Sequence, residues 1–189
     1  FPMIPPLNTA GGSIPTSSIR WDSSWPEWLK GPERDHLLGF FRDRFGIAPV
    51  VFSNYELYRR GPTVWVFSQD DRLQDLAPLR VEAVGMPLLR RVKNHLKPTS
   101  VALQLFGSKA NRNIVSLEPQ KLCDLVQNRE IKGDFDSSPG YVIVVTSSVI
   151  IGCALCLPGR LIAQFPRHMF TAQSCDHLLL SKEWVSDSF

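Results

Sequence analysis

Two of the four cysteines are the first candidates for chemistry, because Cys153 and Cys156 form a Cys-x-x-Cys pair. A four-ligand zinc site needs two further ligands at a suitable spacing, and the sequence has no second Cys-x-x-Cys. The pair also lies in an apolar run that predicts a strand, on which residues three apart point to opposite faces. We therefore expect buried structural cysteines and no metal site.

Patterns for catalysis or nucleotide binding are weak. The four histidines are scattered and lie in no recognised catalytic motif: His36, His95, His168 and His177. Neither Gly-x-Gly-x-x-Gly nor Gly-x-x-x-x-Gly-Lys-Ser/Thr is present. The turn at residues 107–109, with the following 111–113, could hold a phosphate or could be a plain solvated loop. We expect no catalytic residue and no cofactor.

The basic tract of residues 90–97 is the strongest local functional signal. Its cations are Arg90, Arg91, Lys93 and Lys97, and His95 can add hydrogen bonds or stack on a base. The tract belongs to an acid-free stretch, residues 83–117, which also holds Lys109 and Arg112. A second acid-free stretch, residues 137–175, carries Arg160 and Arg167. The net charge is only +3, so the distribution rather than the total suggests one positively charged face. An ordinary solvated surface is the alternative.

The elements that would position these residues in the first half follow from apolar spacing. Residues 1–31 contain five prolines and three tryptophans and predict an irregular arm that packs on the body or on a partner. A helix is expected to begin at Pro32 and to stop at Gly46. Residues 55–59 and 63–68 predict a hairpin, and residues 81–84 and 88–92 predict two more strands.

In the second half, a helix is expected to open at Pro98 and close at Gly107, and another to span residues 119–128. Residues 141–145, 149–157 and 160–165 predict three strands, the first two buried in a small barrel. The segment after Arg167 could form a final strand or helix. The sequence therefore predicts two compact α+β units, with the boundary between them in residues 86–98.

Composition and length set the broad class. Hydrophobic residues make up 43% and charged residues 21% of 189 residues, as in an ordinary globular protein. No apolar run reaches the ~20 residues that span a bilayer, so we expect no membrane partner. Four cysteines are too few for a disulfide scaffold, so we expect an intracellular protein with reduced thiols. The first residue is Phe, which fits either a processed product or an excised part of a longer chain. The compartment is then the cytoplasm or, if a transit peptide was removed, an organelle.

The order of motifs in residues 81–167 resembles the C-terminal region of bacterial ribosomal-RNA cytosine-C5 methyltransferases and of stand-alone archaeal relatives. The runs that carry the resemblance are residues 82–90 (EAVGMPLLR), 95–99 (HLKPT), 106–107, 113–117 (NIVSL), 140–144 (GYVIV), 151–154 (IGCA), 159–161 and 165–167. Upstream, residues 44–47 and 60–66 look like the small domain that precedes the barrel in such proteins. The resemblance covers residues 33–167.

The resemblance implies a small α/β pre-domain followed by a PUA-like β pseudo-barrel, in an α+β chain. The implied division is an arm at 1–31, a pre-PUA domain at 32–92, a PUA-like domain at 93–170 and a C-terminal segment at 171–189. It implies docking of structured RNA, ribosomal RNA above all, and a place in ribosome biogenesis. Four residues lie in the matching motifs and are expected to contact phosphates by this resemblance: Arg90, Lys97, Arg160 and Arg167. Five more are expected to bind RNA because they belong to the basic tracts: Arg91, Lys93, His95, Lys109 and Arg112.

The sequence departs from the methyltransferases where their chemistry is done. Their nucleophilic cysteine follows proline and a second cysteine follows threonine, whereas the residues before the cysteines here are Leu122, Gly152, Leu155 and Ser174. No Rossmann-like half is present. We therefore expect an RNA-binding module that is non-catalytic on its own. Such a module could serve as an accessory domain of an RNA methyltransferase system.

A second hypothesis is an adaptor subunit of a larger ribonucleoprotein or enzyme assembly, held through the Trp-rich arm. Removing residues 1–29 would distinguish the two, because an adaptor would leave its complex while the body kept its fold and RNA affinity.

Overall fold

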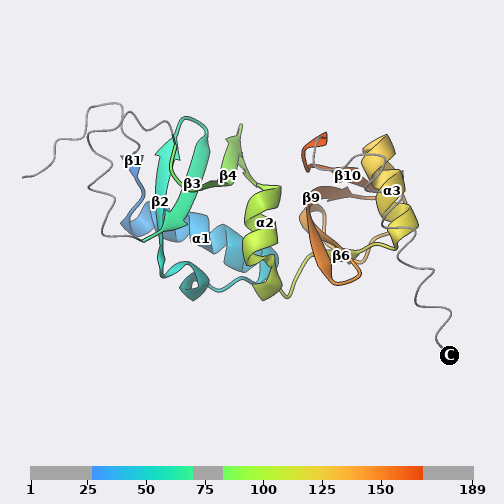
Figure 1. The fold of residues 1–189 in the computed structure, drawn as a ribbon, viewed down its shortest axis with the longest axis horizontal. Coiled ribbons are helices and arrows are strands. Elements are labelled where there is room, and N and C mark those ends of the chain that lie inside the picture. Colours follow the sequence, from blue (N-terminus) through green and yellow to red (C-terminus); the bar gives the residue numbers. More distant parts are fainter. Residues whose placement is uncertain (1–26, 70–82, 168–189) are drawn as a thin grey trace, which may run out of the picture.

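The computed structural model describes residues 27–69 and 83–167, and these form an α+β protein with two five-stranded sheets (Figure 1). This confirms the α+β part of the predicted fold class; in the described residues the second sheet is open, with edge strands at both ends, and does not close into the predicted barrel. The first-sheet region contains, in chain order, β1 (Glu27–Trp28), α1 (Gly31–Phe45), η1 (Pro49–Phe52), β2 (Tyr55–Arg60), β3 (Thr63–Ser68), β4 (Met86–Val92), β5 (His95–Pro98) and α2 (Ser100–Phe106). The second-sheet region contains η3 (Gly107–Lys109), β6 (Ile114–Ser116), α3 (Pro119–Asn128), β7 (Glu130–Lys132), β8 (Gly140–Thr146), β9 (Val149–Leu157) and β10 (Arg160–Ala163).

The first sheet is an antiparallel meander in the order β1-β2-β3-β4-β5, with α1 on one face. The apolar stripe predicted on α1 is the side that is buried: Leu37, Leu38, Phe41 and Phe45. The helix stops at Gly46, as predicted, because this residue takes the left-handed conformation (φ 73°) that glycine adopts without a Cβ penalty. The predicted hairpin of β2 and β3 is also confirmed.

A β-bulge interrupts the pairing of β3 with β4. Val64 lies opposite Leu89 and Trp65 lies opposite Pro87, so Leu88 is one extra residue on β4. Leu88 and Leu89 are both fully buried in the same core. The bulge therefore resets which face of the sheet each later residue of β4 occupies.

The helix α2 lies between the two sheets and belongs to a core that they share. It contacts β4 on one side and β9 on the other (Figure 1). Its buried residues cluster with α1 and the first sheet, and the same cluster includes Ile143 of β8 and Cys153 of β9. The two sheets are thus joined by apolar packing rather than by a linker alone.

The start of α2 differs from the prediction. Pro98 ends β5, where it lies opposite Leu89, and the helix begins at Ser100. Thr99 is the N-cap: its side chain accepts a hydrogen bond from the backbone N–H of Ala102. Residues 86–98, where the sequence suggested a boundary, hold β4 and β5 of the first sheet. The second sheet begins only at Ile114.

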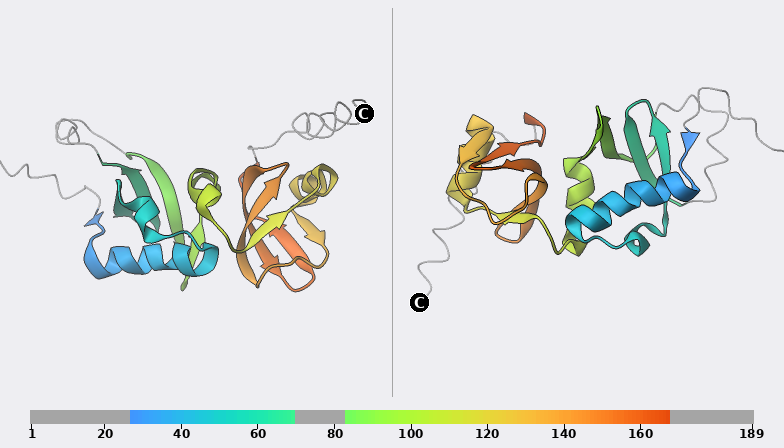
Figure 2. Two further views of the ribbon diagram at one scale, coloured as in Figure 1. Left: turned by 90° about the horizontal axis from the view of Figure 1, so that it is seen from below. Right: turned by 180° about the vertical axis from the view of Figure 1, so that it is seen from behind.

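The second sheet has the order β6-β8-β9-β10-β7, with β6 parallel to β8 and the other pairs antiparallel (Figure 2). The predicted helix of residues 119–128 and the predicted strands β8, β9 and β10 are present. One face of this sheet packs on α2, and the other packs on Leu122 and Leu125 of α3. Cys153 lies in the shared core and Cys156 in the α3 core, so the pair does point to opposite faces.

Several predictions concern residues outside the described ranges: most of the arm, the first half of the strand at 81–84, and the segment after Arg167. The second half of that strand is wrong, because Ala83 and Val84 precede β4 and are not in a strand. Within residues 27–69 and 83–167, no helix is both long and apolar enough to cross a membrane.

Candidate nucleic-acid interface

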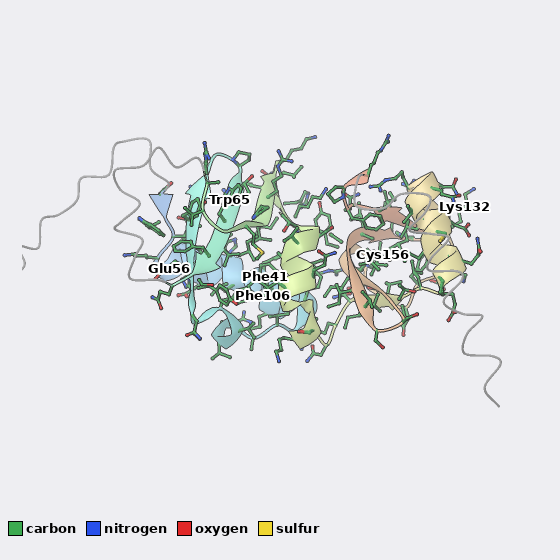
Figure 3. The ribbon with its side chains drawn as sticks, in the orientation of Figure 1. Phe41, Glu56, Trp65, Phe106, Lys132 and Cys156 are labelled. Carbon is green, nitrogen blue, oxygen red and sulfur yellow. The ribbon has the colours of Figure 1, made fainter. Side chains whose placement is uncertain are left out.

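The face of the first sheet that points away from α1, here called the outer face, is built from alternate residues of β2, β3 and β4. Leu57, Val64 and Val66 belong to the core that contains α1, whereas Tyr58 and Trp65 alternate with them and lie on the outer face. Figure 3 labels Trp65 and also Phe41 of α1, the helix that covers the opposite face.

A row of polar residues crosses the outer face at right angles to the strands. Arg60 lies opposite Thr63, Thr63 opposite Arg90, and Arg90 opposite Lys97. Neighbouring strands are about 4.7–4.9 Å apart, so the four side chains stand next to one another on four strands. We call Arg60, Arg90 and Lys97 the basic row. Arg60 and Arg90 are exposed and Lys97 is half-buried.

Arg90 and Lys97 were predicted from the sequence, but Arg60 was not. The predicted strand ended at Arg59, one residue short of the register pair that Arg60 forms with Thr63. The pairing of Thr63 with Arg90 could not be predicted, since it depends on the bulge at Leu88.

Lys97 connects the basic row to the second sheet. Its Nζ donates a hydrogen bond of 2.6 Å to Oε1 of Gln164, which follows β10. The backbone N–H of Gln164 donates to the carbonyl oxygen of Cys153 at 2.9 Å, and so Gln164 is itself held on β9. An ammonium group has three donors, so Lys97 keeps further N–H groups for a ligand.

Arg129 extends the positive charge onto the second sheet and was missed by sequence reasoning. It takes the left-handed conformation at the end of α3 and donates hydrogen bonds to the carbonyl oxygens of Ala163 (3.3 Å) and Phe165 (2.6 Å). Its guanidinium carbon lies 5.1 Å from the centre of the Phe165 ring. Burial lowers the pKa of Arg129, and the positive charge of Arg167 lowers it further, which places Arg167 in its vicinity.

A row of rings lies beside the basic row on the outer face. Trp28, Tyr58, Trp65 and Pro87 are opposite one another on β1 to β4. The rings of Tyr58 and Trp65 are stacked, with centroids 6.2 Å apart and planes at 7°. Tyr58 Oη donates to the carbonyl oxygen of Val84 (2.7 Å) and accepts from its N–H (2.9 Å), and burial raises the pKa of Tyr58. Trp28 and Trp65 remain half-buried.

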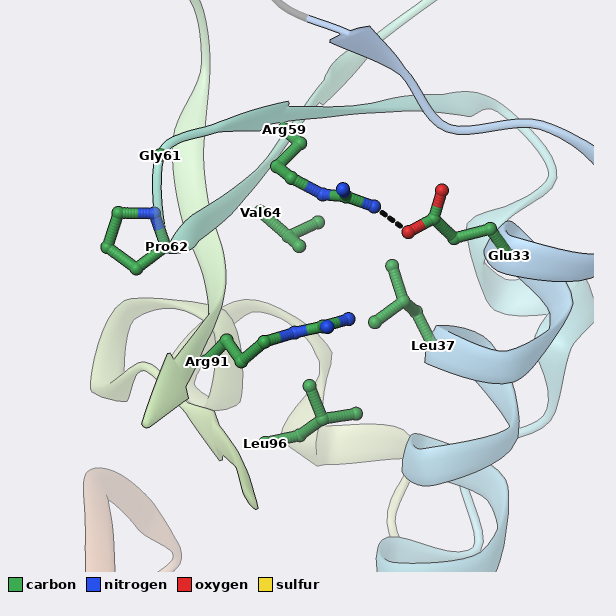
Figure 4. A pocket seen from close by; sticks show the side chains of 8 residues that line it. All are labelled: Glu33, Leu37, Arg59, Gly61, Pro62, Val64, Arg91 and Leu96. Carbon is green, nitrogen blue, oxygen red and sulfur yellow. Dashed lines mark ion pairs between the residues drawn. The ribbon is translucent and has the colours of Figure 1, made fainter. Parts of the chain in front are cut away.

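The other predicted residues are not part of the basic row. Arg91 points toward α1 and lines a cavity of about 190 Å³ beside the ion pair of Arg59 with Glu33 (Figure 4). Lys93 is exposed in the turn between β4 and β5, and His95 lines a groove on the side of α1.

Three more predicted residues lie elsewhere. Lys109 and Arg112 follow α2. The hydrogen bond from Arg42 lowers the pKa of Asp43, and the charge of Arg112 contributes to the same shift. Arg160 forms a 3.6 Å ion pair with Glu130. Of the nine predicted residues, Arg90 and Lys97 thus lie together in the basic row, and Arg167 lies near Arg129 on the second sheet.

The side chains that bind metals, and the cysteine pair in particular, were the other candidates for chemistry. No cluster of three or more His, Cys, Asp or Glu side chains is placed to hold an ion in residues 27–69 and 83–167. The Cys153 thiol is buried, and burial raises its pKa to about 12, so it is protonated at neutral pH.

Fold and site together define a two-sheet α+β protein in which the basic row and the row of rings lie on one face of the first sheet. A family model described as a family of unknown function (DUF7122) matches residues 27–85, from β1 to the approach to β4. This range includes Arg60 of the basic row and the three aromatic residues in the row of rings, Trp28, Tyr58 and Trp65. No curated protein matches the chain.

Proposed function

We propose that this chain is an RNA-binding module that docks structured RNA, with ribosomal RNA as the first candidate. The contact surface is the outer face of the first sheet together with the adjoining edge of the second. The observation that carries the proposal is the basic row. Strand register places Arg60, Arg90 and Lys97 in one line across the sheet, with Thr63 between the two arginines and no acidic residue in the line. Lysine and arginine side chains arranged in this way neutralise successive backbone phosphates.

The row has the right dimensions to follow a nucleic-acid backbone. It crosses β2, β3, β4 and β5, which is three strand spacings or about 14 Å. Lys97 then leads through Gln164 toward Arg129 and Arg167 on the second sheet. A strand of RNA lying across the sheet would meet a cation near each end of the row and another beyond the junction.

The proposal includes a PUA-like second unit that serves RNA docking rather than catalysis. In support, the motif order resembles that of the methyltransferase tails, and the second unit is a small mixed sheet of five strands with α3 on one face. An accessory role beside an RNA-modifying enzyme belongs to the same proposal.

The test uses two neighbouring arginines that the bulge places on opposite faces. Contacts from Arg60, Arg90, Lys97 and Arg167 predict a log–log salt slope of about −2.8 to −3.6, which is a 50- to 150-fold loss of affinity for ribosomal RNA between about 50 and 200 mM salt. The double variant Arg60→Gln/Arg90→Gln should reduce this slope by about 1.4–1.8. Arg91→Gln is the matched control and should leave the slope unchanged.

An equal effect of Arg91→Gln would show that the wrong face has been chosen. Weak binding of the unmodified chain with little salt dependence would remove the RNA proposal and favour the adaptor hypothesis.

A further inference from the structure

A groove of about 940 Å³ lies where α1, the β4–β5 turn and the second sheet meet. Its volume is at the upper end of the about 300–1,000 Å³ typical of small-molecule sites, and such sites favour the junctions between structural units. Its walls come from α1 (Phe40 and Arg44), from the β4–β5 turn (Asn94), from the start of β5 (His95) and from β8 (Tyr141).

Hydrogen bonds from one residue fix the wall on the second sheet. The Arg44 guanidinium donates to the carbonyl oxygens of Tyr141 (2.6 Å), Ser138 (2.7 Å) and Pro139 (3.1 Å) and to Oγ of Ser138 (2.8 Å). Gly140 (φ 125°) lies against this guanidinium, and a Cβ at that position would come within 3.1–3.3 Å of it. The groove is therefore pre-formed across the two units.

The charge of the lining argues against a phosphate and for an uncharged ligand. Two arginines, Arg42 and Arg44, are balanced by Asp35 and Asp43, so the formal charge is 2 − 2 = 0 with neutral histidines. Both arginines are already engaged, Arg42 with Asp43 and Arg44 with the carbonyl oxygens.

The remaining groups suit a flat ring with a hydrogen-bonding edge. Phe40 and Tyr141 present half-buried aromatic rings, and Asn94 and His95 place exposed donors and acceptors at the same groove. Aromatic stacking combined with hydrogen bonds to base edges is how proteins recognise unpaired RNA bases.

We propose that this groove receives an unpaired nucleobase of the RNA whose backbone lies on the basic row. The inference rests on the proposed function and gives it a substrate class: structured RNA with a bulged or looped-out nucleotide. His95 is two residues before Lys97 on β5, about 7 Å along the strand. A nucleotide with its phosphate near Lys97 can thus direct its base toward His95 and the rings behind it.

The experiment compares two RNAs, a short ribosomal-type duplex and the same duplex with bulged uridines, each titrated against the full chain. The chain should prefer the bulged RNA by about 5- to 150-fold, the range that one stacked base contributes. His95→Ala, at an exposed position, and Tyr141→Leu should reduce the preference while duplex affinity and its salt slope stay the same. Tyr141→Phe, which keeps the ring, is the matched control and should retain most of the preference.

A second readout locates the base directly and does not depend on the variants. With 4-thiouridine in the bulge, photo-crosslinks should map to the peptides that contain His95 or Tyr141. Equal, salt-dependent binding of both RNAs, or crosslinks only to β2 and β3, would overturn the groove assignment and leave the basic row standing. Failure of both RNAs to bind would overturn the proposed function and the groove assignment together.

Discussion

Arg44 is the residue whose removal should most clearly separate the two units. It is half-buried, it sits on the last turn of α1, and it donates four hydrogen bonds to residues 138–141, almost a hundred positions further along the chain. A hydrogen bond to a charged group contributes about 1.5–3 kcal/mol net. Those to Ser138 and Pro139 are solvent-exposed and act as one unit with the bond to Tyr141. We therefore expect about 3 kcal/mol for Arg44→Ala rather than the sum of four bonds.

Arg44→Lys is the matched control. It keeps the charge and the apolar stem, but a single ammonium cannot reproduce the planar fork that reaches three carbonyl oxygens. We expect a loss of about 1.5–2 kcal/mol, between the wild type and the alanine variant. Urea unfolding followed by tryptophan fluorescence gives the free energies of unfolding. Hydrogen exchange of the 138–141 amides shows whether the loss is local.

A loss below about 0.5 kcal/mol for Arg44→Ala, the usual effect of a surface substitution, would refute this reasoning. It would mean that the bonds from the Ser137 and Ser138 hydroxyls to the Asn113 amide oxygen hold the loop without Arg44.

Two further predictions concern backbone conformation and buried ionisation. Gly46→Ala should lower the free energy of unfolding by about 2–4 kcal/mol, because φ is 73° and the new Cβ would overlap the Asn111 side chain. Gly61→Ala, at φ 56° with nothing within 4 Å, should lower it by only about 1 kcal/mol, and equal losses would exclude the steric explanation. Burial raises the pKa of Cys153 from 9.0 to about 12, so its contribution to stability is complete below pH 9 and is lost as the pH rises toward 12. Ionisation of this thiol should lower the free energy of unfolding by roughly 1.4 kcal/mol for each pH unit above 9. Urea titrations between about pH 9 and 10 measure this decrease, and the Cys153→Ala variant should lack the part of it that comes from the thiol.

The elements that the sequence predicted are those with a strong local pattern. The stripe of α1, the β2–β3 hairpin, α3 and the long strands of the second sheet all carry periodic apolar residues and end at glycine, proline or polar turns. The strands that were missed, β1, β5, β6 and β7, are two to four residues long and form the edges of the two sheets. Their pairing with a neighbour, rather than their own composition, makes them strands.

The site was less accessible to sequence reasoning than the fold. Charge alone could not distinguish Arg90 from Arg91, because that distinction depends on strand register. Arg129 joins the surface through tertiary contacts with Ala163 and Phe165. The groove combines residues of α1 with residues a hundred positions later, and no local spacing reveals such a juxtaposition.

The bulge at Leu88 has an evolutionary consequence. In a regular strand Leu88 and Leu89 would take opposite faces, Arg90 would turn toward α1, and Arg91 would replace it outside. Lys97 is paired with Arg90 and would turn inward with it, so the outer face would lose the lysine without any change in amino-acid composition. Among related proteins, whether the bulge before this arginine pair is kept therefore tells more about the surface than the number of basic residues does.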